Sequence, residues 1–301
     1  MDLCHTSCSI SLVLIKMKKA IAKADILIEA LPYIKKFQHK VIVVKCGGRQ
    51  LLNKVLINNI LQDIAFMNCV GLNPVLVHGG GPSINEKMQK LGKKVEFHQG
   101  HRVTDEKTLE IVSKELGRLN QEMVQKINQL GAKAKGLSGN AGKVIKAERL
   151  ERRGRNIGFV GRIASIDAQS LKRLLSDSVV PIISPLGIGK DRQLYNINAD
   201  MAAAEIAVSL SAWKLVLLTD VQGIMYDTNE ENSLISTLKA AQVEGLIKRG
   251  VIRKGMIPKV DACMRALRKG VKKTHIVDGS IPRSLLLEIF TDEGIGTQIV
   301  K

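Results

Sequence analysis

Short apolar runs that end in glycine turns alternate with helical patterns along this chain. Residues 41–45 form one such run and are followed by Gly47 and Gly48, and residues 74–78 form another, followed by a triple glycine. Strands that alternate with helices indicate a largely parallel sheet. We therefore predict an α/β fold, a three-layer αβα sandwich with a mainly parallel central sheet. Further strands are expected at 179–184, 214–219 and 274–277, and helices at 51–70, 104–130, 199–210, 257–269 and 282–290.

The composition agrees with this architecture. Aromatic residues make up 3% of the chain and hydrophobic residues 45%, so the core must be built from Val, Ile, Leu and Ala. Such a composition suits a parallel sheet that is buried on both faces. Alternating patterns at 133–138, 143–150 and 158–165 predict antiparallel hairpins at a sheet edge.

The N-terminal region differs from the rest. Residues 1–17 are expected to be a disordered extension, and 18–37 a helix that Pro32 ends or kinks. The apolar stretch at 10–15 is far shorter than the ~18 residues of a membrane span, so no membrane partner is expected. Because no linker rich in Pro, Ser or Gly follows, we expect one domain over 18–301.

The net charge of +18 raises the question of nucleic acid as a partner. The basic residues are spread along the whole chain, and no aromatic residues interleave them as a stacking platform requires. The charge is therefore read as a compositional bias that also attracts anionic substrates. Five cysteines without a C-x-x-C pair fit a reducing compartment, for which we expect the cytoplasm, with the plastid stroma as the alternative.

The glycine turns and one lysine mark a candidate anion site. In an open α/β sheet, ligands bind beyond the carboxyl ends of the strands, and glycines there let backbone amides approach an anion. Lys45 ends an apolar strand and should have an anionic partner. The chain contains no G-x-x-x-x-G-K-[ST] sequence and no G-x-G-x-x-G that opens its first helix, which argues against a P-loop enzyme and a dinucleotide fold.

An esterase is one rival interpretation. His78-Gly79-Gly80-Gly81 resembles an oxyanion loop, and residues 136–140 nearly match a nucleophile elbow around Ser138. The elbow needs glycine where Asn140 stands and a helix after it, whereas 143–150 has a strand pattern. The esterase reading is therefore disfavoured.

Seven motifs lie in order at 44–48, 73–85, 100–105, 136–139, 195–200, 218–224 and 255–260. Together they resemble the amino-acid kinase family, and within it the members that phosphorylate the side-chain carboxylate of N-acetyl-L-glutamate with ATP in arginine biosynthesis. The likeness covers about residues 20–301. Two alternatives stay open: a kinase with carbamate, glutamate, aspartate or uridylate as acceptor, and a non-catalytic binding protein of the same fold.

The resemblance implies a role for each of these sites. Lys45 and Lys259 would clamp the transferring phosphoryl group, and Asp200 would hold both lysines in place without acting as a base. An N-terminal lobe at about 38–190 would bind acetylglutamate, and a C-terminal lobe at about 191–301 would bind ATP with Mg²⁺. The acetylglutamate residues would be Gly80, Gly81, Arg102 and Asn196, and the nucleotide residues Gly47, Gly48, Thr219, Asp220 and Gly223; no protein ligand to the metal is expected.

The resemblance also extends to regulation. Helix 18–37 is similar to the N-terminal helix of arginine-inhibited members, which implies a homo-oligomer, a dimer or a hexamer. Tyr33, Glu288 and Gly294 would then contact arginine as effector, and the nitrogen-signalling PII protein is a further candidate partner. The chain departs from the family pattern at Cys46, at Asn140-Ala141 and at Arg162.

Overall fold

The computed structural model describes residues 4–139, 142–151, 156–227, 230–253, 255–291 and 294–301. Its main sheet has eight strands in the order β12-β14-β13-β11-β1-β2-β8-β5. Every adjacent pair is parallel except β13–β14, which confirms the predicted α/β class. The strands are β1 (Val41–Cys46), β2 (Asn73–His78), β5 (Lys133–Leu137), β8 (Val179–Ile183), β11 (Lys214–Thr219), β12 (Thr237–Lys239), β13 (Lys273–Asp278) and β14 (Thr297–Val300).

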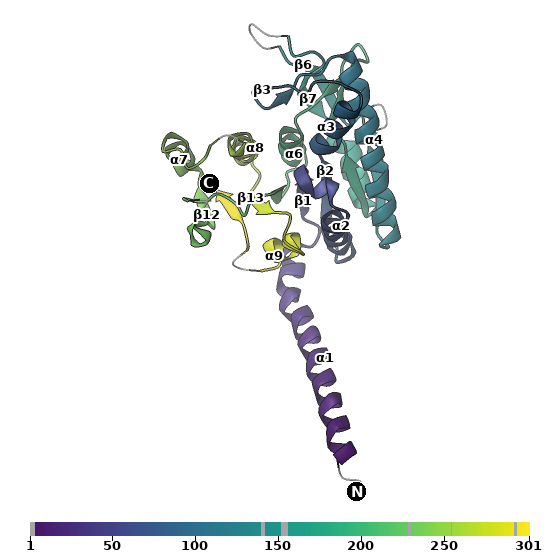
Figure 1. The fold of residues 1–301 in the computed structure, drawn as a ribbon, viewed down its shortest axis with the longest axis vertical. Coiled ribbons are helices and arrows are strands. Elements are labelled where there is room, and N and C mark those ends of the chain that lie inside the picture. Colours follow the sequence, from purple (N-terminus) through teal and green to yellow (C-terminus); the bar gives the residue numbers. More distant parts are fainter. Residues whose placement is uncertain (1–3, 140–141, 152–155, 228–229, 254, 292–293) are drawn as a thin grey trace.

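Both faces of this sheet are covered by helices (Figure 1). Successive side chains of a strand point to opposite faces, and in β1 Val43 packs into one core cluster while Ile42 and Val44 pack into the other. The alternation explains why the first four residues of β1, Val41 to Val44, are all apolar, as in buried parallel strands. One layer contains α2 (Lys54–Cys69), α4 (Glu106–Gln129) and α9 (Ser284–Ile289), and the other α5 (Ala168–Ser176), α6 (Ala199–Ser209), α7 (Val243–Lys248) and α8 (Met256–Arg268).

The edge hairpins were predicted only in part. Residues 143–150 and 158–165 do contribute an antiparallel pair, β6 (Ile145–Arg149) with β7 (Gly161–Ile166). This pair belongs to a separate four-stranded sheet with β9 (Leu186–Ile188) and β10 (Leu194–Asn196). The expected hairpin at 133–138 is wrong, because β5 pairs in parallel with β8 at the edge of the main sheet.

The N-terminal region also differs from the prediction. Helix α1 spans Cys4–Phe37, so it begins inside the segment expected to be a disordered extension and continues past Pro32. No glycine or proline precedes Pro32, so residues 1–31 contain no strong helix breaker. In Figure 1 α1 projects from the body with the N-terminus at its far end. Within the described residues, no helix has both the length and the apolarity to cross a bilayer.

The order of strands places the site. The chain passes from β1 to β2 on one side, and later from β11 to β13 on the other side of β1. The connections therefore diverge at β1 and β11, and ligands of open α/β sheets bind in the crevice at such a point. The glycines after β1 and β2 lie at the carboxyl ends of these two strands, beside this crevice. Helix α3 (Gly81–Lys90) begins at the same place. A short hairpin, β3 (Phe97–His98) with β4 (His101–Arg102), follows α3.

Candidate active site

Three charged side chains from different elements meet at the end of β1. The Nζ atom of Lys45 lies 2.9 Å from Asp200 Oδ1, and the Nζ atom of Lys259 lies 3.2 Å from Asp200 Oδ2. Asp200 lies in the first turn of α6 and Lys259 in the first turn of α8. The structure thus brings together the three residues predicted as catalytic. Lys45 is buried and therefore needs an anionic partner, and Asp200 is that partner.

The charges in this cluster are mutually dependent. Burial raises the pKa of the Asp200 carboxyl, but the ammonium groups of Lys45 and Lys259 outweigh it and lower the pKa to about 2. Burial lowers the pKa of Lys45, but Asp200 outweighs it and the net direction is upward. Burial and the nearby Lys45 lower the pKa of Lys259, against the opposing effect of Asp200 and Asp220. Two ammonium groups and one carboxylate have a net positive charge, which favours the binding of an anion.

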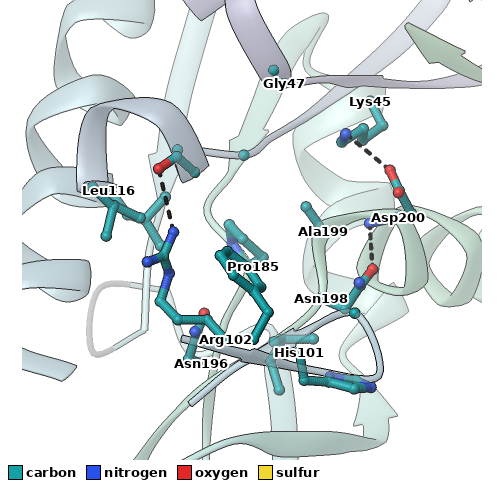
Figure 2. A pocket seen from close by; sticks show the side chains of 18 of the residues that line it. Lys45, Gly47, His101, Arg102, Leu116, Pro185, Asn196, Asn198, Ala199 and Asp200 are labelled. Carbon is teal, nitrogen blue, oxygen red and sulfur yellow. Dashed lines mark hydrogen bonds and ion pairs between the residues drawn. The ribbon is translucent and has the colours of Figure 1, made fainter. Parts of the chain in front are cut away.

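A cavity of about 340 Å³ opens beside this cluster (Figure 2). Its walls come from the glycine turns after β1 and β2, from the β3–β4 hairpin and from the start of α6. The absence of a Cβ matters at Gly47, where a Cβ would lie 2.8 Å from the Lys45 ammonium. Gly47, Gly48, Gly80 and Gly81 all line the cavity. Predicted phosphate and acceptor glycines therefore share one pocket.

Arg102 lies across the cavity from Lys45 and Asp200 (Figure 2). Its guanidinium donates to Asn85 Oδ1 at 2.5 Å and to the Gly81 carbonyl at 3.3 Å, and it stacks 4.7 Å from the centre of the Phe97 ring. It is buried, and burial lowers its pKa. Because its contacts in the described structure are neutral, this cation is positioned to receive an anionic ligand.

The two asparagines before α6 have different surroundings. Asn198 caps the helix, because its Oδ1 accepts from the amides of Asp200 at 2.9 Å and Met201 at 3.1 Å. This cap fixes the first turn that carries Asp200. Asn196 lines the cavity and donates from Nδ2 to Thr104 Oγ1 at 3.1 Å. Its side-chain oxygen Oδ1 accepts no hydrogen bond from a described residue and is available to a ligand.

The other predicted nucleotide residues lie outside the cavity lining. Thr219 ends β11 and is buried, and its carbonyl accepts from the Gln50 side chain. Asp220 pairs with Arg49 at 3.3 Å and still acts on the pKa of Lys259. Gly223 packs tightly, since a Cβ there would lie 2.6 Å from Thr297 Oγ1. No group of three or more described His, Cys, Asp or Glu side chains could hold a metal ion by itself.

Glu288, one of the predicted effector residues, belongs to a second buried polar group. Glu288 is 5% exposed, and its Oε1 lies 2.5 Å from His275 Nδ1. Its Oε2 accepts from the amides of Ile295 at 2.8 Å and Gly296 at 3.0 Å. A Cβ on Gly294 would lie 2.8 Å from the same oxygen. Glu288 and Gly294 are thus adjacent.

The third predicted effector residue, Tyr33, packs in the adjoining core, whereas a lysine that the sequence did not single out lies close to this group. Tyr33 packs against the core cluster that includes residues of α9. Lys214 is buried, and burial lowers its pKa to about 8 although Glu288 opposes the shift. A carboxylate, an imidazole and an ammonium therefore gather beneath the C-terminal end of α1.

Sequence reasoning missed a polar cluster beneath the glycine turn after β2. His78 ends that strand and is completely buried, with its Nε2 3.0 Å from Ser184 Oγ and 3.1 Å from Asn120 Nδ2. The signal was present: His78 ends an apolar strand just as Lys45 does, and a buried imidazole needs partners.

The departures from the family pattern have simple surroundings where they are described. Cys46 is buried in the core, where burial raises the pKa of its thiol to about 12. Arg162 is exposed and pairs with Glu148 across β6 and β7. Asn140 and Ala141 lie outside the described residues.

Comparison with known proteins identifies the family. The model of the amino acid kinase family matches residues 40–278. Acetylglutamate kinases from Syntrophomonas wolfei and Desulforamulus reducens are 49% and 48% identical over 93% and 94% of this chain, and the matches cover 98% and 99% of those proteins.

Solved structures share the fold of this chain. An N-acetylglutamate synthase from Neisseria gonorrhoeae, complexed with coenzyme A and N-acetyl-glutamate, is 27% identical with a TM-score of 0.82 over 91% of this chain, which spans 62% of the synthase chain. Carbamate kinase from Giardia lamblia shares the fold at 18% identity and a TM-score of 0.63, over 87% of this chain and 99% of that one. The chain belongs to the amino acid kinase family, and within it to the acetylglutamate kinases.

Proposed function

We propose that this chain transfers the γ-phosphoryl group of ATP to the side-chain carboxylate of N-acetyl-L-glutamate and forms N-acetyl-L-glutamyl 5-phosphate, as a step of arginine biosynthesis. The observation that carries the proposal is the bridge from Lys45 through Asp200 to Lys259 beside a glycine-lined cavity. The names of the relatives supply the acceptor.

The chemical step needs positive charge and alignment. A carboxylate oxygen of the acceptor forms a bond to the γ-phosphorus, and the bond to the oxygen that bridges to the β-phosphorus breaks, so that ADP leaves with the electron pair. The acceptor is already ionised at pH 7, so no general base is required. The reaction places negative charge on the phosphoryl oxygens, which Lys45 and Lys259 are arranged to stabilise.

The charge on Asp200 suits an organising role. The two lysines hold its pKa near 2, so it remains an anion at any working pH and cannot carry a proton between groups. Its two oxygens face different ammonium groups, which keeps Lys45 and Lys259 together despite their like charge. We assign Asp200 to positioning these two cations.

The acceptor would lie between Arg102 and the glycine turns. The planar fork of Arg102 is suited to the α-carboxylate of acetylglutamate, because a guanidinium binds a carboxylate through two parallel hydrogen bonds. We assign the acetamido group to Asn196 and the reacting carboxylate to the amides of Gly80 and Gly81. All four residues line the same cavity as Lys45 and Asp200, which supports this orientation.

The nucleotide would extend from Gly47 and Gly48 toward Thr219, Asp220 and Gly223 at the end of β11. Gly47 lies beside the Lys45 ammonium, where backbone and side-chain donors can reach phosphate oxygens together. Mg²⁺ keeps several of its waters and usually binds substrate phosphates, so we propose that it arrives with the nucleotide. Its contribution would be to neutralise phosphate charge.

A comparison of acceptors tests the proposal. The purified chain is incubated with ATP, Mg²⁺ and hydroxylamine, which traps an acyl phosphate as its hydroxamate. We expect product with N-acetyl-L-glutamate and at least tenfold less with L-glutamate or L-aspartate. Product with another acceptor alone would assign the chain a different substrate, and no product with any acceptor would favour a binding protein.

Regulation and assembly form a finer part of the proposal. We propose that arginine binds near Tyr33, Glu288 and Gly294, and that a homo-oligomer, a dimer or a hexamer, forms through α1. The apolar side chains of Ile26 and Leu27 are exposed on α1, and a second copy of this helix could cover them. PII is kept as a candidate partner, and the cytoplasm, or else the plastid stroma, as the compartment.

A further inference from the structure

The backbone after β2 is attached to the buried imidazole of His78. The Nδ1 atom of His78 lies 2.9 Å from the Gly79 carbonyl oxygen, in the turn that lines the cavity. On the other side of the ring, Nε2 lies 3.0 Å from Ser184 Oγ and 3.1 Å from Asn120 Nδ2. The ring therefore links the glycine turn to β8 and α4, the elements beneath it.

These partners determine which ring nitrogen carries the proton. The amide nitrogen of Asn120 only donates, and it also reaches the Ile182 carbonyl at 2.9 Å and Ser184 Oγ at 3.2 Å, so its contact with Nε2 of His78 is compatible with an accepting Nε2 without requiring one. The Gly79 carbonyl only accepts, so Nδ1 must donate. The neutral form with hydrogen on Nδ1 meets this requirement and leaves Nε2 as an acceptor for Asn120 or Ser184. Burial lowers the pKa of His78 to about 4, so the ring is neutral at neutral pH.

The carbonyl of Gly79 and the amide of Gly80 belong to one peptide group. That group is planar and trans, so its C=O and N–H point in opposite directions. When His78 holds the carbonyl toward the buried side, the Gly80 N–H must point away from it. Gly80 itself lines the cavity, so this direction leads toward the ligand.

The packing of Gly80 and the lack of internal partners agree with this orientation. A Cβ on Gly80 would lie 2.8 Å from Leu116 Cδ2, so the turn is pressed onto α4 and has little room to rotate. Among the described residues, neither the Gly80 nor the Gly81 amide donates a hydrogen bond. Both are free N–H groups at the start of the ten-residue helix α3, where an anion is favoured.

We propose that His78 is a positioning residue: its Nδ1–H holds the Gly79 carbonyl and thereby aims the Gly80 amide at the carboxylate that accepts the phosphoryl group. The proposal rests on the proposed function. In the proposed reaction, an amide donor must be directed at the reacting carboxylate. Removing one such donor typically lowers the rate of acyl-transfer enzymes a hundredfold or more.

Two substitutions distinguish the contribution of Nδ1 of His78 from that of Nε2. In His78→Asn, the amide nitrogen can take the place of Nδ1 and still donate to the Gly79 carbonyl. In His78→Gln, the longer side chain can reproduce only the contacts of Nε2 with Ser184 and Asn120. We expect H78Q to lose roughly tenfold or more in kcat/KM for acetylglutamate, and H78N to recover most of that loss. The KM for ATP should stay within about twofold in both variants, because the turn contacts the acceptor.

A structural role alone predicts a different pattern. Loss of activity that follows the loss of Tm equally in the two variants, or a larger loss in H78N than in H78Q, would overturn the proposal. The wild-type hydroxamate assay is run first, so failure of the proposed function is recognised before any variant is compared.

A measurement on the wild-type chain removes the dependence on folding of the variants. Nitrogen chemical shifts of ¹⁵N-labelled histidine side chains distinguish a protonated from an unprotonated ring nitrogen, and the signals absent in H78N belong to His78. We expect a neutral ring with hydrogen on Nδ1 at pH 7. A ring with hydrogen on Nε2 alone could not donate to Gly79, and that result would refute the inference.

Discussion

Lys45 and Asp200 meet at 2.9 Å, although one lies at the end of a buried strand and the other in the first turn of a helix from the other half of the chain. Lys259 adds a second ammonium at 3.2 Å from the same carboxylate. All three side chains are largely removed from water, so the excess positive charge is weakly screened. This arrangement attracts an anion and depends on a single carboxylate.

Replacing Asp200 with Asn should therefore damage both catalysis and folding. Two buried ammonium groups would face each other without a counter-charge, and breaking a buried ion pair in this way costs about 3 kcal/mol or more. We expect kcat to fall at least a hundredfold and the urea midpoint to fall with it. Adding Lys259→Met to Asp200→Asn should restore part of the stability, because it removes one uncompensated charge. A double variant less stable than D200N would contradict this account.

Lys259→Met tests the second cation by itself. Turnover should fall at least a hundredfold, whereas Tm should change little, because Lys259 retains some exposure and Asp200 keeps its pair with Lys45. Lys269→Met is the matched control, since Lys269 follows the same helix and pairs with the carboxylate of Glu205 away from the cavity. Unchanged turnover in K259M would show that the assignment is wrong.

The strands of the main sheet could be predicted because their apolar runs end in clear signals. The direction of a strand is harder to predict, as β5 shows: its alternating pattern fits either a hairpin or a parallel edge strand. The choice depends on α4, which returns the chain to the same end of the sheet before β5 begins. Helix α1 was predicted too short because no glycine or proline in the sequence before Pro32 marks where the helix starts.

The charged part of the site was predictable for a different reason. A lysine at the end of a buried strand needs an anionic partner. The distance along the sequence does not show which carboxylate forms that ion pair. Only the order of motifs pointed to Asp200. The cluster of His78, Asn120 and Ser184 was missed because its members come from three elements whose proximity depends on the packing of α4 against β2 and β8.

Arg102→Lys should weaken binding of the acceptor and leave the nucleotide unaffected. Lysine retains the charge but loses the planar fork, the stacking on Phe97 and the contact with Asn85. We expect the KM for acetylglutamate to rise roughly tenfold, with the KM for ATP unchanged, in assays that vary one substrate at a time. Arg118→Lys on the exposed side of α4 serves as the control. An equal rise in both KM values would place Arg102 elsewhere in the mechanism.

The buried His78 should make the stability of the wild type depend on pH. Its pKa is about 4 in the folded chain and near 6.5 when unfolded, so between these values the unfolded chain binds more protons. Stability contributed by this group is complete above pH 6.5 and falls by about 3 kcal/mol as the pH drops to 4. The difference in unfolding free energy between wild type and H78N, measured with urea, should shrink by that amount. A difference independent of pH would contradict the assigned burial effect.

Arginine should raise the apparent KM for acetylglutamate, if the proposed effector site is correct. The site would place the guanidinium near the Glu288 carboxylate and the backbone at Gly294, beneath α1, so L-lysine at the same concentration is the matched control. Gly294 has a φ of 65°, and a Cβ there would lie 2.8 Å from Glu288 Oε2, so Gly294→Ala must shift this carboxylate or strain the turn. We expect G294A to require at least tenfold more arginine for the same effect while the KM without arginine stays near that of the wild type, because Gly294 lies outside the cavity. A flat dose response in the wild type would remove the effector site, whereas a normal response in G294A would move it away from Glu288.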